Sequence, residues 1–215
     1  MGALHAGHGT VIRSASLMGP VLVSVFVNPL QFGPNEDLDQ YPRSLESDLV
    51  LAERWGAAAL WAPSIEQIYP HGLESHSPRL QVPLALQEHL CGAKRPGHFD
   101  GVVAVVARLL ELVRPRQLWL GEKDWQQLVI LRWLVAHLAL PVTVQGVATV
   151  READGLALSS RNQYLSADQR RMAVALPRAL SAALGAGFNP VPSIRRTLSD
   201  AGFDYQGCIK FNQTY

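Results

Sequence analysis

Two histidines stand three positions apart in the segment His5-Ala6-Gly7-His8, at the start of a predicted helix. This spacing puts both imidazoles on one face of the first helical turn, and the glycine lets the backbone approach a phosphate closely. Free N–H groups at a helix N-terminus, together with two imidazole donors, suit phosphoryl or nucleotidyl transfer. Two solvent-facing histidines at a chain terminus are the alternative. A zinc site is a weaker one, because no further histidine or cysteine is placed to complete it.

A second candidate group, Gly121-Glu122-Lys123-Asp124-Trp125-Gln126-Gln127, directly follows a strand-like segment and opens a helix. Lys123 at the carboxyl end of a strand would reach the crevice where a helix N-terminus lies, and its ammonium would act as a point charge for phosphate. Asp124 followed by Gln127 also has the form of a helix N-cap and its capping partner. The sequence therefore predicts a phosphate contact at Lys123 and a capping box at Asp124.

Three further polar segments could border a site. Leu158-Ser159-Ser160-Arg161-Asn162 combines small hydroxyl residues with a fixed cation, which suits a loop that closes over a triphosphate or an ordinary surface loop. The segment from Asn28 to Asn35 leaves a strand end, so Asn28 and Gln31 could bind a polar substrate, although Asn in a turn needs no function. Arg95 to Gly101 opens an apolar helix and suits either a cap or a substrate gate.

The elements that must position these residues alternate between strand and helix patterns. A continuous apolar run at 21–27 is typical of a strand buried on both faces of a parallel sheet. Strand, helix, strand and helix in succession predict an α/β fold, a doubly wound Rossmann-like parallel sheet with crossover helices. We expect a domain of residues 1–149 and a smaller C-terminal α/β domain of residues 150–215. Further predicted elements are helices at 44–55, 99–113, 124–138, 166–185 and 193–201, and strands at 57–62, 118–120, 142–147 and, weakly, from 203.

The composition limits the function classes. The chain has 215 residues, of which 48% are hydrophobic and 17% charged, with 19 basic and 18 acidic side chains. A balanced net charge of +1 gives no excess for a nucleic-acid or membrane surface, and no apolar run approaches the roughly 20 residues of a membrane span. The two cysteines, Cys91 and Cys208, lack metal-type spacing. These features predict a cytoplasmic globular protein with reduced thiols.

The order of these segments carries a resemblance that no single motif does. The motifs M-G-A-L-H-x-G-H, F-V-N-P-x-Q-F-G-P-x-E-D, R-P-G-H-F-D-G-V, G-E-K-D-x-Q-Q and R-E-x-D-G-L-A-x-S-S-R-N, spread from residue 1 to about 165, closely resemble pantothenate synthetase. The resemblance implies a cytosolic ligase, usually a homodimer, of the nucleotidylyltransferase superfamily. It would join (R)-pantoate to β-alanine through a pantoyl adenylate, using ATP and magnesium and releasing AMP and pyrophosphate, with no covalent enzyme nucleophile.

The resemblance also implies residue roles. His8 is the residue usually assigned acid chemistry, His5 would lie by the phosphates, Lys123 would neutralise their charge and Arg161 would belong to the closing loop. Gln31 would contact pantoate and β-alanine, Gln127 would contact pantoate, and Asn28 is a further substrate candidate. The magnesium ligands are unknown, with ATP oxygens expected to supply most of them. The ATP-binding set would be Met1, Gly2, Ala3, Leu4, His5, Ala6, Gly7, His8, Gly121, Glu122, Lys123, Asp124, Val150, Leu158, Ser159, Ser160 and Arg161.

The sequence departs from the family pattern in three places. Leu158 stands where methionine is usual, which is a volume-conserving change. Family members carry a strand and a helix before the first motif, and the ending at 209–215 does not resemble theirs, so the first strand is expected to be missing and the C-terminal domain incomplete. Two alternatives follow: a truncated, impaired product with its site residues unsupported, or a related nucleotidylyltransferase with another acceptor. The segments at 28–35 and 95–101 argue against the second.

Overall fold

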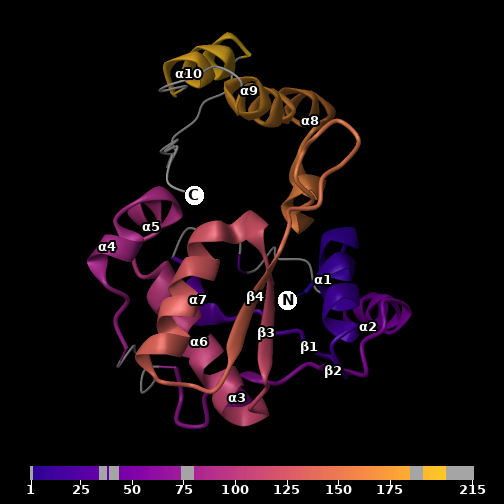
Figure 1. Ribbon diagram of the computed structural model, residues 1–215, viewed down its shortest axis with the longest axis vertical. Helices are drawn as coiled ribbons and strands as arrows, with labels where there is room; N and C mark the ends of the chain where they lie inside the picture. Colours follow the sequence, from indigo (N-terminus) through magenta and orange to yellow (C-terminus); the bar gives the residue numbers. More distant parts are fainter. Residues whose placement is uncertain (1, 34–37, 39–43, 74–79, 185–190, 202–215) are drawn as a thin grey trace. The chain divides into compact units, whose positions relative to one another are not determined.

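The chain divides into two units, residues 1–149 and 150–215. The structure is a computed structural model that describes residues 2–33, 38, 44–73, 80–184 and 191–201 (Figure 1). Within these ranges no helix has both the length and the apolar character needed to cross a bilayer. Predictions that concern Met1, Cys208 and the weak strand from 203 fall outside the described residues.

The first unit is built from parallel strand pairs linked by helices. Strand β1 (Leu22–Ser24) pairs with β2 (Ala59–Trp61), and β3 (Gln117–Gly121) pairs with β4 (Thr143–Val147). Helix α2 (Leu45–Arg54) connects the first pair, and η3 (Glu122–Asp124) and α7 (Trp125–His137) connect the second. The remaining elements are α1 (Ala6–Ser16), η1 (Pro29–Gln31), α3 (Ile65–Ile68), α4 (Leu84–Gln87), α5 (Leu90–Lys94) and α6 (His98–Val113).

This arrangement confirms the predicted α/β fold with parallel strands. Each pair is a strand–helix–strand unit, the connection that parallel strands require because a tight turn cannot join them. In the described part of the chain the strands form two separate two-stranded sheets rather than one continuous sheet, because no described strand joins β1 to β3. The apolar run at 21–27 forms only a short strand, although the Val25 N–H still donates to the Trp61 carbonyl at 2.8 Å.

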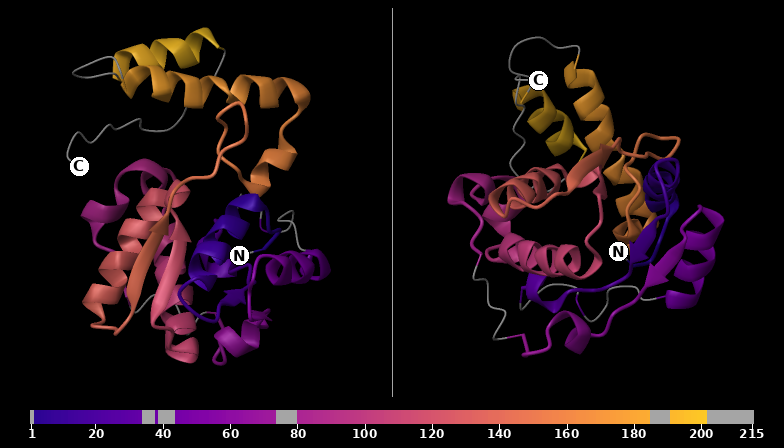
Figure 2. Two further views of the ribbon diagram at one scale, coloured as in Figure 1. Left: turned by 45° about the vertical axis from the view of Figure 1, so that its right-hand side comes forward. Right: turned by 60° about the horizontal axis from the view of Figure 1, so that its bottom comes forward.

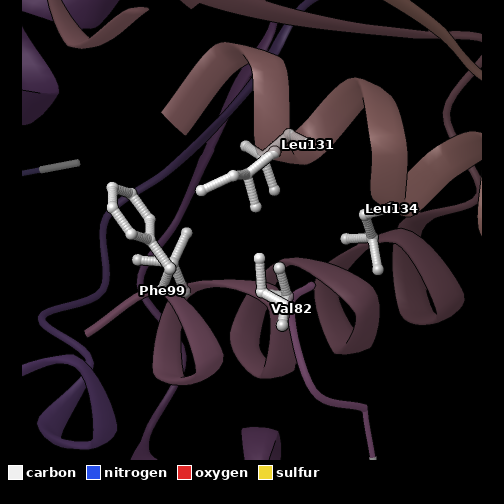
Figure 3. Packing of buried hydrophobic residues seen from close by; sticks show 7 residues of the cluster. Val82, Phe99, Leu131 and Leu134 are labelled. Atoms are coloured by element: carbon white, nitrogen blue, oxygen red, sulfur yellow. The ribbon is translucent and has the colours of Figure 1, made fainter. Parts of the chain in front are cut away.

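Helices α6 and α7 pack together and enclose the largest apolar cluster of the first unit. Phe99 of α6, Leu131 and Leu134 of α7, and Val82 from the segment before α4 point toward one another (Figure 3). Their apolar spacing along the sequence, which predicted both helices, reflects this contact face. A second cluster joins α1, β1 and α2 and contains Leu4, Ile12, Val23 and Ala52. It fixes the start of α1 against the rest of the unit.

The second unit begins with a hairpin-like segment and continues into helices. The isolated antiparallel bridge between Arg151 and Ala157 precedes η4 (Ser160–Tyr164), α8 (Ala167–Ala173), α9 (Ala175–Leu184) and α10 (Val191–Asp200). Among the described residues of this unit there is no strand longer than that bridge. Helices α9 and α10 lie side by side in Figure 2. They bury Ala179, Ala183, Ile194 and Leu198 between them.

The predicted capping box at the start of α8 is confirmed. The Ser166 hydroxyl accepts from the Gln169 N–H at 3.2 Å, and the Gln169 side chain accepts from the Ser166 N–H at 2.9 Å. The prediction of one unbroken helix from 166 to about 185 is wrong, because α8 ends before Val174 and α9 starts after it. Pro177 explains the break, since it has no N–H for the carbonyl four residues earlier and its ring crowds that carbonyl.

Candidate functional site

The histidine-bearing turn is the centre of the candidate site. His5 is the N-cap of α1, and its Nδ1 accepts a hydrogen bond from the Gly7 N–H at 3.1 Å. Reciprocally, the Nδ1 of His8 accepts from the His5 N–H at 3.2 Å. The two rings lie 4.1 Å apart between centroids, on the same side of the helix start, as their spacing predicts. Two imidazoles thus form a capping box, a role usually filled by hydroxyl, carboxyl or amide side chains.

This capping fixes the protonation state of both rings. A ring nitrogen that accepts a backbone N–H carries no proton, so each neutral imidazole holds its proton on Nε2. Burial lowers the pKa of His8 to about 3, with further lowering from the neighbouring His5 and from Lys123. Burial and then Lys123 also lower the pKa of His5. At neutral pH the turn therefore offers two uncharged Nε2–H donors, and acid chemistry at His8 stays a prediction.

A buried carboxylate on another helix holds the segment just before these histidines. Asp48 of α2 is only 1% exposed, and its two oxygens accept from the Leu4 N–H at 2.6 Å and the Ala3 N–H at 3.0 Å. Ala3 has a φ of 49°, in the left-handed region that favours glycine. Asp48 therefore holds a bent backbone in place directly upstream of His5. Sequence reasoning missed it, because an aspartate in the first turn of a helix looks like an ordinary helix-dipole partner.

Lys123 follows β3 and lies within electrostatic range of both histidines, since its charge contributes to lowering both of their pKa values. The ammonium is partly exposed and lies 3.0 Å from Oδ1 of Asp124. Asp124 is the N-cap of α7 but makes no capping hydrogen bond, so the predicted capping box with Gln127 is wrong. The 3₁₀ turn at 122–124 changes the approach to the helix, and the Asp124 carboxylate faces Lys123 instead. Gln127 is half-buried in the first turn of α7.

The segment after β1 turns over at η1, and internal hydrogen bonds hold its polar residues. Asn28 is 2% exposed; its Oδ1 accepts from Leu30 N–H at 3.3 Å, and its Nδ2 donates to the Gly101 carbonyl at 3.0 Å. Nδ1–H of His98 donates to the Gln31 carbonyl at 2.7 Å. The Gln31 backbone is thus tied to α6. The structure assigns Asn28 an anchoring role; a direct substrate contact by Asn28 or Gln31 stays a prediction.

In the second unit the predicted loop residues form one compact segment. The Leu158 N–H donates to the Val150 carbonyl at 2.9 Å, and the Ser159 hydroxyl caps η4 by accepting from the Arg161 N–H at 3.3 Å. Arg170 of α8 holds this segment through Glu152 at 2.7 Å and Asp154 at 2.8 Å. The predicted residues Val150, Leu158, Ser159, Ser160 and Arg161 therefore belong to this segment of the second unit. The other described site candidates belong to the first unit, and they are Gly2 to His8, Gly121 to Asp124, Asn28, Gln31 and Gln127.

The described residues form no cluster of three or more histidine, cysteine, aspartate or glutamate side chains that could hold a metal ion. The Asp124 carboxylate, whose charge acts on His5, is engaged by Lys123. These residues do not provide the oxygen-rich ligand set that magnesium prefers. They provide N–H donors and one ammonium, which suit anionic oxygens of a nucleotide.

Comparison of the chain with known proteins identifies its family. The model of the family described as pantoate-beta-alanine ligase matches residues 1–211. A bifunctional pantoate ligase/cytidylate kinase of Synechococcus sp. (strain CC9902) is 82% identical over 206 residues, which cover 96% of this chain and 43% of that protein. The chain thus spans less than half the length of the curated relatives it matches.

Solved structures agree with the sequence comparison. Pantothenate synthetase from Thermus thermophilus is 49% identical with a TM-score of 0.85, over 94% of this chain and 73% of that one. Pantoate-beta-alanine ligase from Francisella tularensis, solved in complex with beta-gamma ATP and beta-alanine, is 34% identical with a TM-score of 0.86, over 99% of this chain and 79% of that one. With the motifs at residues 1–8, 26–37, 95–102, 121–127 and 151–162, these matches show that the chain belongs to the pantoate-beta-alanine ligase family.

Proposed function

We propose that this chain catalyses the ATP-dependent ligation of (R)-pantoate to β-alanine. The observation that carries the proposal is the convergence of His5, His8 and Lys123 at the N-terminus of α1, in a chain of this family. A helix N-terminus with two neutral imidazole donors and an ammonium stabilises negative charge on a transferring phosphoryl group. The relative from Francisella tularensis was solved with an ATP compound and β-alanine, which supports both as substrates.

The reaction has two steps. A carboxylate oxygen of pantoate attacks the α-phosphorus of ATP, the bond from that phosphorus to the bridging oxygen of pyrophosphate breaks, and pantoyl adenylate forms. The β-alanine amine then attacks the acyl carbon, the bond to AMP breaks, and the amine loses a proton. Nε2–H of His5 and of His8 would donate to phosphate oxygens as their charge rises, while Lys123 offsets that charge. No side chain has to form a covalent intermediate.

The remaining residue roles are part of the same proposal. Met1 to His8 and Gly121 to Asp124 would line the nucleotide, with Val150 toward adenine and Leu158 to Arg161 over the phosphates. Gln31 and Gln127 would bind the small substrates. Magnesium would enter with the ATP oxygens, since the described residues offer no ligand cluster. A homodimer in the cytoplasm, with residues 1–149 and 150–215 as its two domains, completes the proposal.

A direct assay tests this function. We expect the purified chain to form pantothenate from pantoate, β-alanine and ATP, and to catalyse pantoate-dependent exchange of pyrophosphate into ATP. Lys123→Ala and His8→Ala should abolish the exchange. Lys94→Ala and His137→Ala are matched controls, because both side chains are exposed and lie outside the site. Near-normal exchange in both site variants would contradict the residue roles, and AMP transfer to a phosphorylated acceptor without any need for β-alanine would contradict the substrate.

A further inference from the structure

A buried tyrosine is hydrogen-bonded to the residue that caps the η1 turn. Tyr69, at the end of α3, is 2% exposed, and its hydroxyl donates to Oδ1 of Asn28 at 2.8 Å. Tyr69 lies in a further apolar cluster of the first unit with Ile68 and Val105, against which Phe26 and Leu30 pack. Tyr69 and Asn28 are 41 positions apart in the sequence, so no local sequence pattern connects the two.

The Asn28 side chain connects Tyr69 to the rest of the turn through further hydrogen bonds. Its Oδ1 accepts from both Tyr69 and the Leu30 N–H, while its Nδ2 donates to the Gly101 carbonyl of α6. A backbone N–H at Leu30, one residue before Gln31, therefore shares an acceptor with the tyrosine. Burial raises the pKa of Tyr69, so the hydroxyl stays protonated and keeps its donor function.

The other side of the turn leaves little room for adjustment. A Cβ on Gly101 would meet the Leu30 carbonyl and lie 2.7 Å from the Gln31 nitrogen, so α6 and η1 are in direct backbone contact. His98 holds the Gln31 carbonyl, and Arg95 Nη1 donates to Nε2 of the His98 ring at 3.0 Å. Asn28 on one side and His98 with Gly101 on the other therefore hold the backbone of this turn, from which the Gln31 side chain extends.

We propose that Tyr69 is a positioning residue for substrate binding, acting through Asn28 to orient the Gln31 turn toward pantoate. The substrate named in this inference rests on the proposed function, whereas the hydrogen bond between Tyr69 and Asn28, called the anchor below, does not. Removal of the hydroxyl takes one of two donors from the Asn28 oxygen in a buried position. A neutral hydrogen bond of this kind is worth about 1 kcal/mol, or roughly fivefold in an equilibrium constant.

Tyr69→Phe is the test, because it removes one oxygen and keeps the ring in its apolar cluster. We expect the Michaelis constant for pantoate to rise about fivefold while the Michaelis constant for ATP stays within twofold of the wild type. The amide of Leu30, followed by hydrogen exchange in NMR spectra, should exchange about fivefold faster. This second readout needs no catalysis.

Val105→Ala is the matched control. Val105 belongs to the same cluster and is 6% exposed, so its truncation loosens the packing around Tyr69 but leaves the hydroxyl bond in place. It should lower the melting temperature without a selective change in the constant for pantoate. If both variants change that constant equally, or if Tyr69→Phe leaves it unchanged, Tyr69 has only a structural role and the inference is wrong. A Leu30 amide that exchanges at the wild-type rate would also overturn it.

The two readouts separate this inference from the proposed function. If the wild-type chain forms no pantothenate but Tyr69→Phe accelerates exchange at Leu30, the ligase proposal fails and the anchor stands. If the wild type is active and Tyr69→Phe changes neither readout, the anchor fails and the ligase proposal stands.

Discussion

Replacement of Asp48 by alanine should destabilise the first unit through two backbone groups that directly precede the histidine turn. The carboxylate is almost completely buried and accepts from two consecutive N–H groups, those of Ala3 and Leu4. Alanine leaves both donors without that acceptor. The Leu4 donor lies in a buried position, whereas Ala3 is half-buried and water can replace part of its lost bond.

The magnitude follows from these two bonds. An unsatisfied buried donor costs about 1–3 kcal/mol, and hydrogen bonds to charged groups lie toward the upper end of the scale. With one donor buried and one partly hydrated, we expect Asp48→Ala to lower the free energy of unfolding by about 2–4 kcal/mol. Asp48→Asn keeps one acceptor oxygen, so its loss should be about half as large. Either loss is a large part of a typical stability of about 5–15 kcal/mol.

Urea unfolding followed by circular dichroism measures this loss, with Glu46→Ala as the control. Glu46 and Asp48 are both in the first turn of α2, so both substitutions remove the same favourable interaction with the helix dipole. Glu46 is exposed, and its loss should cost less than about 1 kcal/mol. If Asp48→Ala costs no more than Glu46→Ala, the carboxylate acts only on its own helix and the reasoning about the histidine turn is refuted.

Three further outcomes are expected. Gly101→Ala should lower the melting temperature by several degrees and weaken pantoate binding, because a Cβ there meets the Leu30 carbonyl; an unchanged melting curve would show that α6 and η1 are not in contact. His8 has its folded pKa lowered to about 3 from 6.5, so it binds a proton only after unfolding between these values. The contribution of His8 to the free energy of unfolding should therefore be at its maximum above pH 6.5 and fall as the pH drops toward 3, by at most about 1.4 kcal/mol per pH unit. His8→Gln should make this pH dependence less steep in urea titrations. Arg170→Ala should speed hydrogen exchange of the Leu156 amide, which donates to Asp154. Arg171→Ala, which removes an exposed ion pair with Asp168, should leave that exchange rate unchanged.

The sequence predicted the elements whose patterns are local. The apolar spacing at 99–113 gave α6, and the capping box at Ser166 gave the start of α8. The three-residue spacing of His5 and His8 placed both rings on one face. In each case the pattern itself repeats within one or two helical turns, where periodicity is informative.

Long-range contacts were beyond such patterns. Asp48 meets Leu4 across 44 positions, and Tyr69 meets Asn28 across 41. An amide after a strand has the same sequence signature whether it faces a ligand or, as Asn28 does, the protein interior. The capping box predicted at Asp124 failed for a local reason instead. A 3₁₀ turn precedes the helix, and the adjacent Lys123 engages the carboxylate, a competition that no rule of spacing weighs.

The two parallel strand pairs, β1–β2 and β3–β4, imply an order of folding for the first unit. The pair β3–β4 closes over one helix, from Gly121 to Thr143, whereas β1 and β2 must meet across the longer stretch from Ser24 to Ala59. Loop-closure entropy grows with the length of the loop, and non-local pairing forms slowly. The β3–β4 pair, with α6 and α7 packed against it, is therefore expected to form early. Because Leu4 and Ile12 pack on Val23 and Ala52, the histidine turn is expected to complete its packing when the slower pair of β1 and β2 forms.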